Sequence, residues 1–173
     1  MKYQIKSEEC WKNALNLVAH FEGLRLNAYT CPAGYLSIGY GHRMDAGDVR
    51  QITSETAKSL LVADFGRFVD AVHDIFPYLW EGQLFALASL SYNLGLSWVG
   101  KDKNLGREVR ALNNRQMVSG SDVKLQYNVT WYMGKYCYHH VKGKPVLSEG
   151  LRQRRLAEID LFNGELHYLS NKK

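Results

Sequence analysis

Residues 21–42 read FEGLRLNAYTCPAGYLSIGYGH, a segment with a single acidic residue, Glu22. Upstream, Ser7 can cap a helix whose apolar residues recur at helical spacing: Trp11, Ala14, Leu15, Val18 and Phe21. Because Gly23 is a natural helix stop, Glu22 is predicted to lie in the last helical turn, where the helix dipole disfavours negative charge. A carboxylate at this unfavourable end is a hint of function.

The residues that follow this helix predict a β-hairpin. Residues 24–29 and 35–41 alternate apolar and polar side chains, as strands with one buried face do. Between them, Thr30–Gly34 contains the proline and glycine of a turn. The tip and the return strand, which carry Cys31 and Ser37, can therefore fold back towards the carboxylate.

Beyond this hairpin the chain is predicted to be mainly helical. The clearest helices are a long one capped by Thr53 or Ser54 and ended by Pro77, an apolar core helix over 82–94, and a last helix over 148–162. Shorter helical pieces are expected between them, with breaks near residues 95–100, 119–120 and 142–145. The predicted strands all lie in one early block, so the fold class is α+β.

We expect one domain over residues 1–173, made of two lobes with a cleft between them. The small hairpin lobe would cover about residues 20–55, and the connecting helix about 54–77. The larger, mostly helical lobe would cover about residues 78–173, with the N-terminal helix packed on it.

The composition is that of an ordinary globular chain and leaves the kind of partner open. The chain is 46% hydrophobic and has a net charge of +5. The basic excess favours polyanionic partners such as nucleic acid, an anionic cell wall or a membrane surface, but solubility alone also requires a few net charges. The odd number and wide spacing of the cysteines argue against a disulfide framework and suit a reducing compartment: Cys10, Cys31 and Cys137.

The sequence shows no segment that would carry the chain across a membrane. The longest nearly apolar run, residues 84–90, is far shorter than the ~20 residues that a span needs. The N-terminus, MKYQIKSEECWK, lacks the apolar core of a signal peptide. We therefore expect the protein to stay in the cytoplasm of the cell that makes it until something else releases it.

Each candidate site residue also has a purely structural interpretation. Glu22 could be a surface residue, Cys31 a small buried hydrophobe, and Ser37 only a strand hydroxyl. The functional interpretation of Glu22 gains from its place at the helix–hairpin junction, because such a junction can shield a catalytic acid from water. Gly39 and Gly41 weaken a strand unless something approaches its backbone closely, and a bound polymer is one candidate.

Two further polar clusters are weaker candidates. A metal site is not expected, because no standard zinc spacing is formed by Cys137, His139 and His140. A solvated helix face is the simplest interpretation of Arg152, Arg154 and Arg155. One of these arginines could instead pair with a buried carboxylate, because arginine binds carboxylates through two parallel hydrogen bonds.

Three ordered blocks of the chain closely resemble the phage-type lysozymes, the endolysins of glycoside hydrolase family 24. The motif of that family is Glu, eight residues, Asp or Cys, five residues, and Thr. Glu22, Cys31 and Ser37 follow this spacing, with Ser in the third position, and the block continues to His42. Residues 87–95, LASLSYNLG, resemble the family's core helix, and GLRQRRLAEIDLF from Gly150 resembles its closing arginine-rich helix. The resemblance covers nearly the whole chain.

The resemblance implies a lysozyme-like fold and hydrolysis of the β-1,4 bond between N-acetylmuramic acid and N-acetylglucosamine in bacterial peptidoglycan. It implies that Glu22 is the general acid and that Cys31 and Ser37 hold and activate the attacking water. The supporting or substrate-binding residues are predicted to be Tyr35, His42 and Arg154. The last of these is the implied partner of the general acid, and no cofactor or metal is expected.

Two of these positions leave the details of the reaction open. The serine at position 37 keeps a hydroxyl but lacks the methyl group of threonine, so we expect activity with less preorganisation. A thiolate at Cys31 could accept a proton, but a neighbouring carboxylate disfavours ionisation of the thiol. A water-orienting role is therefore favoured over covalent attack on the sugar.

Three rival functions remain open. A lytic transglycosylase needs only the acid Glu22, a wall peptidase could use Cys31 as nucleophile with His42 as base, and an inactive module would only bind the wall. The peptidase is disfavoured because Cys31 precedes a proline in a turn, not the positive N-terminus of a helix. We expect a monomer that binds peptidoglycan rather than nucleic acid, does not insert stably into membranes, and reaches the wall through a separate holin-type protein.

Overall fold

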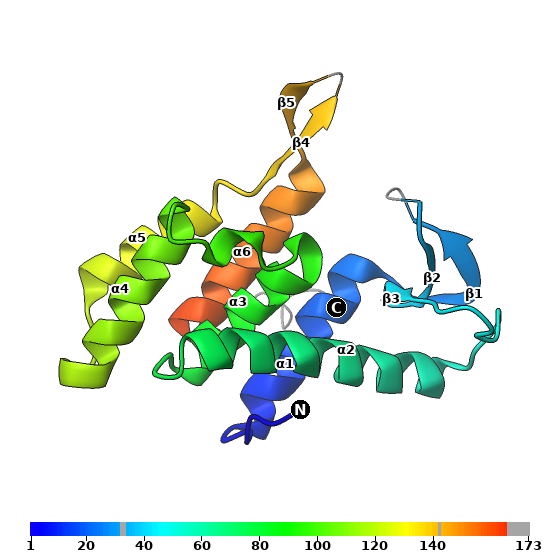
Figure 1. The fold of residues 1–173 in the computed structure, drawn as a ribbon, viewed down its shortest axis with the longest axis horizontal. Helices are drawn as coiled ribbons and strands as arrows, with labels where there is room; N and C mark the ends of the chain where they lie inside the picture. Colours follow the sequence, from blue (N-terminus) through cyan, green and yellow to red (C-terminus); the bar gives the residue numbers. More distant parts are fainter. Residues whose placement is uncertain (32–33, 142, 166–173) are drawn as a thin grey trace.

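The computed structural model describes residues 1–31, 34–141 and 143–165, and Figure 1 shows their arrangement. A small three-stranded sheet lies at one end of the long helix α2 (Ser54–Ile75), and the other helices form a body around α3 (Glu81–Leu94). The fold class is α+β, as predicted, with a majority of helix and two small antiparallel sheets among the described residues.

Helix α1 (Glu8–Glu22) ends at the predicted residue. Its start is capped by Ser7, whose hydroxyl accepts a backbone N–H of the first turn. At its end, Gly23 has a φ of 70°, a region that favours glycine, and its N–H bonds to the carbonyl of Ala19. The chain therefore turns sharply into the sheet and leaves Glu22 at the junction.

The sheet consists of β1 (Arg25–Thr30), β2 (Leu36–Gly39) and β3 (His42–Arg43), which are antiparallel in that order. The first two strands form the predicted hairpin, although residues 32–33 of its turn lie outside the described residues. The register shifts within β1, so this strand contains a bulge. The third strand is not predicted by the sequence, because its two residues follow directly on the predicted strand 35–41 and show no alternation of their own.

One face of the sheet rests on α2. Ile38 and His42 are cross-strand partners on β2 and β3, and both line a small cavity against Thr56 of α2. Because neighbouring residues of a strand point to opposite faces, Ser37 and its partner Arg43 point away from α2. The sheet therefore has one supported face and one face turned away from the helix beneath it.

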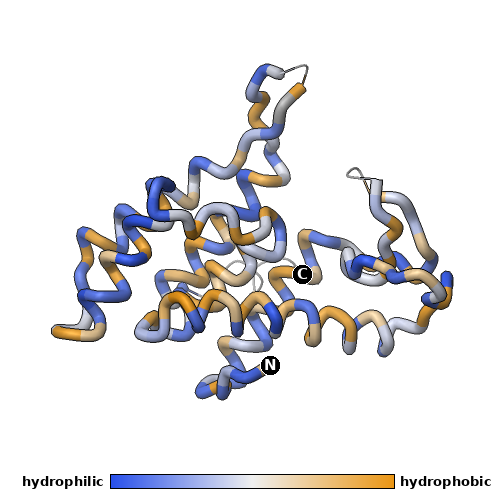
Figure 2. The backbone as a smooth tube through the Cα atoms, viewed as in Figure 1, coloured by the Kyte–Doolittle hydropathy of each residue, from blue (hydrophilic) through white to orange (hydrophobic). Residues whose placement is uncertain are grey.

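Helix α3 is the centre of the core, as its apolar sequence predicts. Its apolar side chains from Leu84 to Leu90 are fully buried, and α1, α2 and α6 (Glu149–Asn163) pack against it. The body is completed by η1 (Ser97–Val99), α4 (Asn104–Ser119) and α5 (Val123–Met133). Figure 2 shows hydrophobic and hydrophilic residues alternating along α2, the pattern of a helix with one buried face.

The prediction that all strands lie in one early block is wrong. A second hairpin, β4 (Tyr138–Val141) and β5 (Lys144–Leu147), projects from the body in Figure 1. Pro145 favours a break in the sequence, but both strands of an isolated pair are edges, where proline is tolerated. Gly143, with a φ of 77°, helps the chain to reverse; residue 142 lies outside the described residues.

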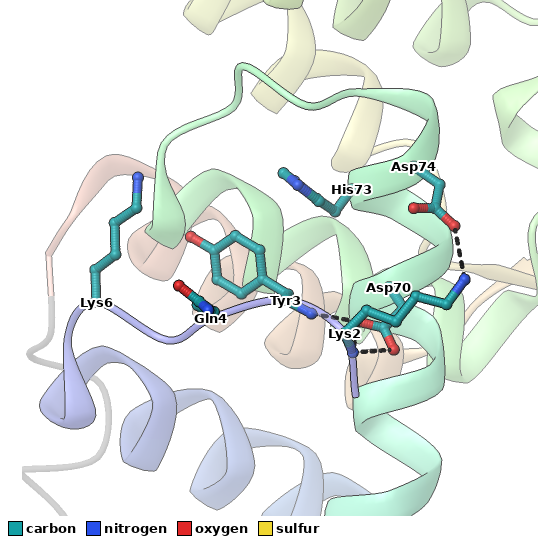
Figure 3. Close-up of a pocket in the computed structure, with 7 residues that line it drawn as sticks. All are labelled: Lys2, Tyr3, Gln4, Lys6, Asp70, His73 and Asp74. Carbon is teal, nitrogen blue, oxygen red and sulfur yellow. Dashed lines mark hydrogen bonds and ion pairs between the residues drawn. The ribbon is translucent and has the colours of Figure 1, made fainter.

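The N-terminal segment ties three helices together. Asp70 of α2 accepts hydrogen bonds from the backbone N–H groups of Lys2 and Tyr3 at 2.7 and 2.9 Å, beside the pocket drawn in Figure 3. Glu81 of α3 accepts the two backbone N–H groups of residues 6–7. Burial, together with the charge of Glu81, raises the pKa of Tyr3 to about 12. This segment therefore braces the end of α2 that lies away from the sheet.

Candidate functional site

Glu22 and Arg154 form an ion pair between α1 and α6. Nη1 of Arg154 donates to Oε1 of Glu22 at 2.6 Å. The Glu22 side chain is 21% exposed, whereas Arg154 is buried. The structure therefore contains the pair that the family resemblance implies. The simpler interpretation of residues 152–155 as a solvated face is wrong, because only Arg152 of the three arginines is exposed.

A buried carboxylate, Glu158, holds the two buried arginines of α6 in place. One of its oxygens lies 3.1 Å from Nε of Arg154, and the other lies 3.1 Å from Nε of Arg155. It also accepts the hydroxyl hydrogen of Ser89 at 2.8 Å. Burial raises the pKa of Glu158, and the two guanidinium groups oppose that shift. Arg154 thus reaches Glu22 from a fixed network.

The backbone at Gly41 approaches the carboxyl from the side of the sheet. A Cβ at this position would lie 3.5 Å from Oε2 of Glu22, and the φ of 85° favours glycine. The neighbouring carbonyl of Tyr40 accepts the hydroxyl hydrogen of Tyr92 at 2.8 Å, which ties this loop to α3. Burial, followed by the charges of Asp64 and Glu22, raises the pKa of Tyr92, so the phenol stays protonated and able to donate.

The face of the sheet that points away from α2 carries a row of three residues, one from each strand. Ser37 lies opposite Tyr29 of β1 and opposite Arg43 of β3. Cross-strand partners share a face, so these side chains are neighbours, and Ser37 is only 4% exposed. Burial, followed by the charge of Glu22, raises the pKa of Tyr29, and the charge of Arg25 opposes this shift.

Cys31 and Tyr35 extend this face towards the hairpin tip. The N–H of Cys31 donates to the carbonyl of Tyr35 at 2.8 Å, which continues the ladder beyond the two strands. Because Cys31 lies two residues after Tyr29, it shares the face of Ser37. Tyr35 is 47% exposed, and the guanidinium of Arg43 lies 3.7 Å from the centre of its ring. The sheet therefore presents the predicted thiol, phenol and hydroxyl on one side.

His42 lies on the opposite face of the sheet. Its Nδ1 is 2.8 Å from Oδ2 of Asp64 on α2, and the same carboxylate pairs with Arg67. His42 therefore links the sheet to α2, and the structure does not bring it together with Cys31.

Replacing Asp64 with Asn is expected to loosen the sheet from α2. The side chain is largely buried, and the substitution removes the charge that His42 and Arg67 both contact. We expect a loss of about 1–3 kcal/mol in the free energy of unfolding, measured by thermal denaturation, with faster amide hydrogen exchange in residues 36–43. Asp74→Asn, an exposed position on the same helix, is the matched control. Identical exchange in residues 36–43 of both variants would contradict the proposed link.

Some residues of this site escaped the sequence analysis, although weak signals for them exist. Tyr29 precedes Cys31 by two residues, so a strand assignment already places both on one face. Glu158 follows Arg154 by four residues, which is the spacing of ion pairs on a helix. Tyr92 has no such local signal, because its partner Tyr40 is distant in the sequence.

The described residues contain no cluster of three or more His, Cys, Asp or Glu side chains that could hold a metal ion. None of the helices in the described part of the chain combines the length and apolar character needed to cross a membrane. No disulfide joins the three cysteines, all of which the structure describes. Burial and the charge of Glu81 raise the pKa of Cys10 to about 11, so this thiol stays protonated at neutral pH.

A partly exposed carboxyl at the junction of a helix and a small sheet, held by an arginine of a helical body, defines a lysozyme-like glycoside hydrolase. The chain belongs to the phage lysozyme family, whose sequence profile matches residues 19–158.

Known relatives agree with this assignment in sequence and in structure. The endolysin of Acyrthosiphon pisum secondary endosymbiont phage 1 is 33% identical over 159 residues, which cover 87% of this chain and 95% of that protein. The muramidase domain of SpmX from Asticaccaulis excentricus superposes with a TM-score of 0.74 at 27% identity, covering 92% of this chain and 98% of that one. The endolysin from Escherichia coli O157:H7 phage FAHEc1 has a TM-score of 0.66 at 28% identity, covering 92% and 96%.

Proposed function

We propose that this chain is an endolysin-type muramidase that hydrolyses the β-1,4 bond between N-acetylmuramic acid and N-acetylglucosamine in bacterial peptidoglycan. The observation that carries the proposal is the ion-paired carboxyl of Glu22 at the helix–sheet junction. Cys31 and Ser37 support it, because they occupy the family's spacing and share one face of the sheet. The relatives named above are themselves endolysins or a muramidase domain.

In the proposed reaction, Glu22 donates its proton to the glycosidic oxygen as the bond from that oxygen to the anomeric carbon breaks. A water molecule oriented by Cys31 and Ser37 attacks the anomeric carbon from the opposite face and releases a proton to solvent, from which Glu22 is reprotonated. Arg154 fixes the orientation of the carboxyl. This sequence of steps inverts the anomeric configuration.

Two rival reactions are less well supported. A peptidase would need His42 beside Cys31, but His42 shares the α2-facing side of the sheet with Ile38 and bonds to Asp64. A lytic transglycosylase would need Glu22 alone and would leave Cys31 and Ser37 without a chemical role.

We also propose that the protein acts as a monomer and reaches the wall after a separate holin-type protein opens the membrane. The support is the family itself, whose members named above include phage endolysins. Membership of the same family supports the proposal that the protein acts at the cell wall.

Product analysis on purified peptidoglycan tests the function directly. We expect new reducing ends with N-acetylmuramic acid at the cleaved end, and inversion at the anomeric carbon, because water attacks from the face opposite the leaving group. Mass spectrometry and anomer analysis by NMR give these readouts. Products with 1,6-anhydro ends would establish a transglycosylase, net retention would establish covalent attack, and new amino groups without reducing ends would establish a peptidase. Release of nothing by a protein that binds the wall would establish an inactive module.

A further inference from the structure

Near Ser37 the sheet carries two arginines that the proposed reaction does not use. Arg43 is the cross-strand partner of Ser37 on β3, so their Cβ atoms lie roughly 4.5–5.5 Å apart. Arg25 lies on β1, the strand of Tyr29, and Tyr29 is the other cross-strand partner of Ser37. Both arginine side chains are exposed.

Each of these arginines stacks on a tyrosine of the same sheet. The guanidinium carbon of Arg43 lies 3.7 Å from the ring centre of Tyr35, and that of Arg25 lies 4.7 Å from the ring centre of Tyr29. Stacking on an aromatic ring orients the planar guanidinium while leaving its N–H groups able to bind another partner. One member of each stack, Tyr29 or Arg43, is a cross-strand partner of Ser37, so the two stacks flank Ser37.

The charges of Arg25 and Arg43 are not neutralised within the described parts of the chain. No carboxylate there forms an ion pair with either residue, whereas Arg154 and Arg155 are both paired with Glu158. An oriented guanidinium without an internal carboxylate is suited to a carboxylate from outside, because arginine binds this group through two parallel hydrogen bonds.

We propose that Arg43, assisted by Arg25, binds a carboxylate of the substrate next to the bond that is cleaved. This inference rests on the proposed function, because the neighbourhood of Ser37 is the place of water attack only in that reaction. In peptidoglycan the carboxylate belongs to the stem peptide or, where the peptide is absent, to the lactyl group of N-acetylmuramic acid. The two stacks therefore select acidic wall glycan over neutral glycans of the same backbone.

The test is equilibrium binding of soluble peptidoglycan fragments in a Glu22→Gln background, in which turnover during the measurement is slowed. Three fragment preparations are compared: native fragments, fragments stripped of peptides by an amidase, and fragments whose carboxyls are blocked by amidation. Arg43→Gln is expected to weaken binding of the native or the stripped fragments about tenfold, as loss of a charge-assisted contact does. It is expected to leave the blocked fragments bound as tightly as by the parent.

Each outcome has a defined meaning. If Arg43→Gln weakens binding of the native fragments alone, the bound carboxylate belongs to the stem peptide. If it weakens binding of the stripped fragments, the bound carboxylate is the lactyl group. Both results support the proposal. Arg43→Lys should bind between the parent and Arg43→Gln, because it keeps the charge but loses the planar fork. The proposal is overturned if Arg43→Gln weakens binding of the blocked fragments equally, or if it weakens binding of no fragment. It is also overturned if Lys124→Gln weakens binding as much as Arg43→Gln does. Lys124 is an exposed control on α5 with the same change in charge.

This readout separates failure of the inference from failure of the proposed function. Binding does not require turnover, so the charge dependence is measured even if the parent enzyme releases no reducing ends. Conversely, the parent enzyme could release reducing ends while Arg43→Gln binds every fragment as tightly as the parent. The proposed function would then stand, and only this inference would fail.

Discussion

Glu22→Gln is expected to lower the rate of reducing-end release from peptidoglycan by about 10²–10⁴-fold, the usual contribution of a positioned general acid. Gln has nearly the shape of Glu and can still accept a hydrogen bond from Arg154, so the fold should be retained. What it cannot do is donate the proton that the leaving oxygen needs. The rate is measured as reducing sugar released per enzyme, with the melting temperature measured in parallel.

A control on the same helix separates chemistry from charge. Glu8→Gln makes the same substitution at the exposed start of α1, far from the ion pair, and should leave the rate unchanged. A Glu22→Gln enzyme that retains the parental rate would refute the assignment of the acid.

The second large effect concerns stability. Glu158→Gln is expected to lower the free energy of unfolding by about 3–5 kcal/mol, because it leaves two buried guanidinium groups without their shared carboxylate. For a chain of this size the melting temperature should fall by roughly 10 °C. Thermal denaturation followed by circular dichroism measures the loss.

Glu149→Gln is the matched control for this prediction. Glu149 lies on the same helix and also contacts an arginine, but in a solvated position, so its melting temperature should stay close to that of the parent. Equal effects of the two substitutions would mean that burial of the network contributes nothing.

The parts of the fold that were predicted correctly depend on local signals. The end of α1 at Glu22 follows from Gly23, and the start of α6 follows from Ser148, whose hydroxyl accepts the N–H of Leu151. The hairpin follows from alternation around a turn, and the centre of the core follows from continuous apolar character in α3.

The parts that escaped prediction depend on contacts between distant segments. Arg154 and Arg155 resemble a solvated face until the buried Glu158 and Glu22 are placed beside them. The second hairpin escaped because Pro145 indicates a break unless its edge position is known. The separation of His42 from Cys31 requires the register of the sheet, which the spacing of the two residues alone does not determine.

The contact between Arg154 and Glu22 has a consequence for when the enzyme becomes competent. The two residues are 132 positions apart in the chain, and one belongs to the first helix and the other to the last. Contacts of such long range form late, because a large loop must close before they stabilise anything. A ribosome-bound chain that lacks α6 also lacks Arg154, so its acid has no arginine to orient it. The carboxyl of Glu22 is therefore held in its catalytic orientation only once α6 has been made and packed.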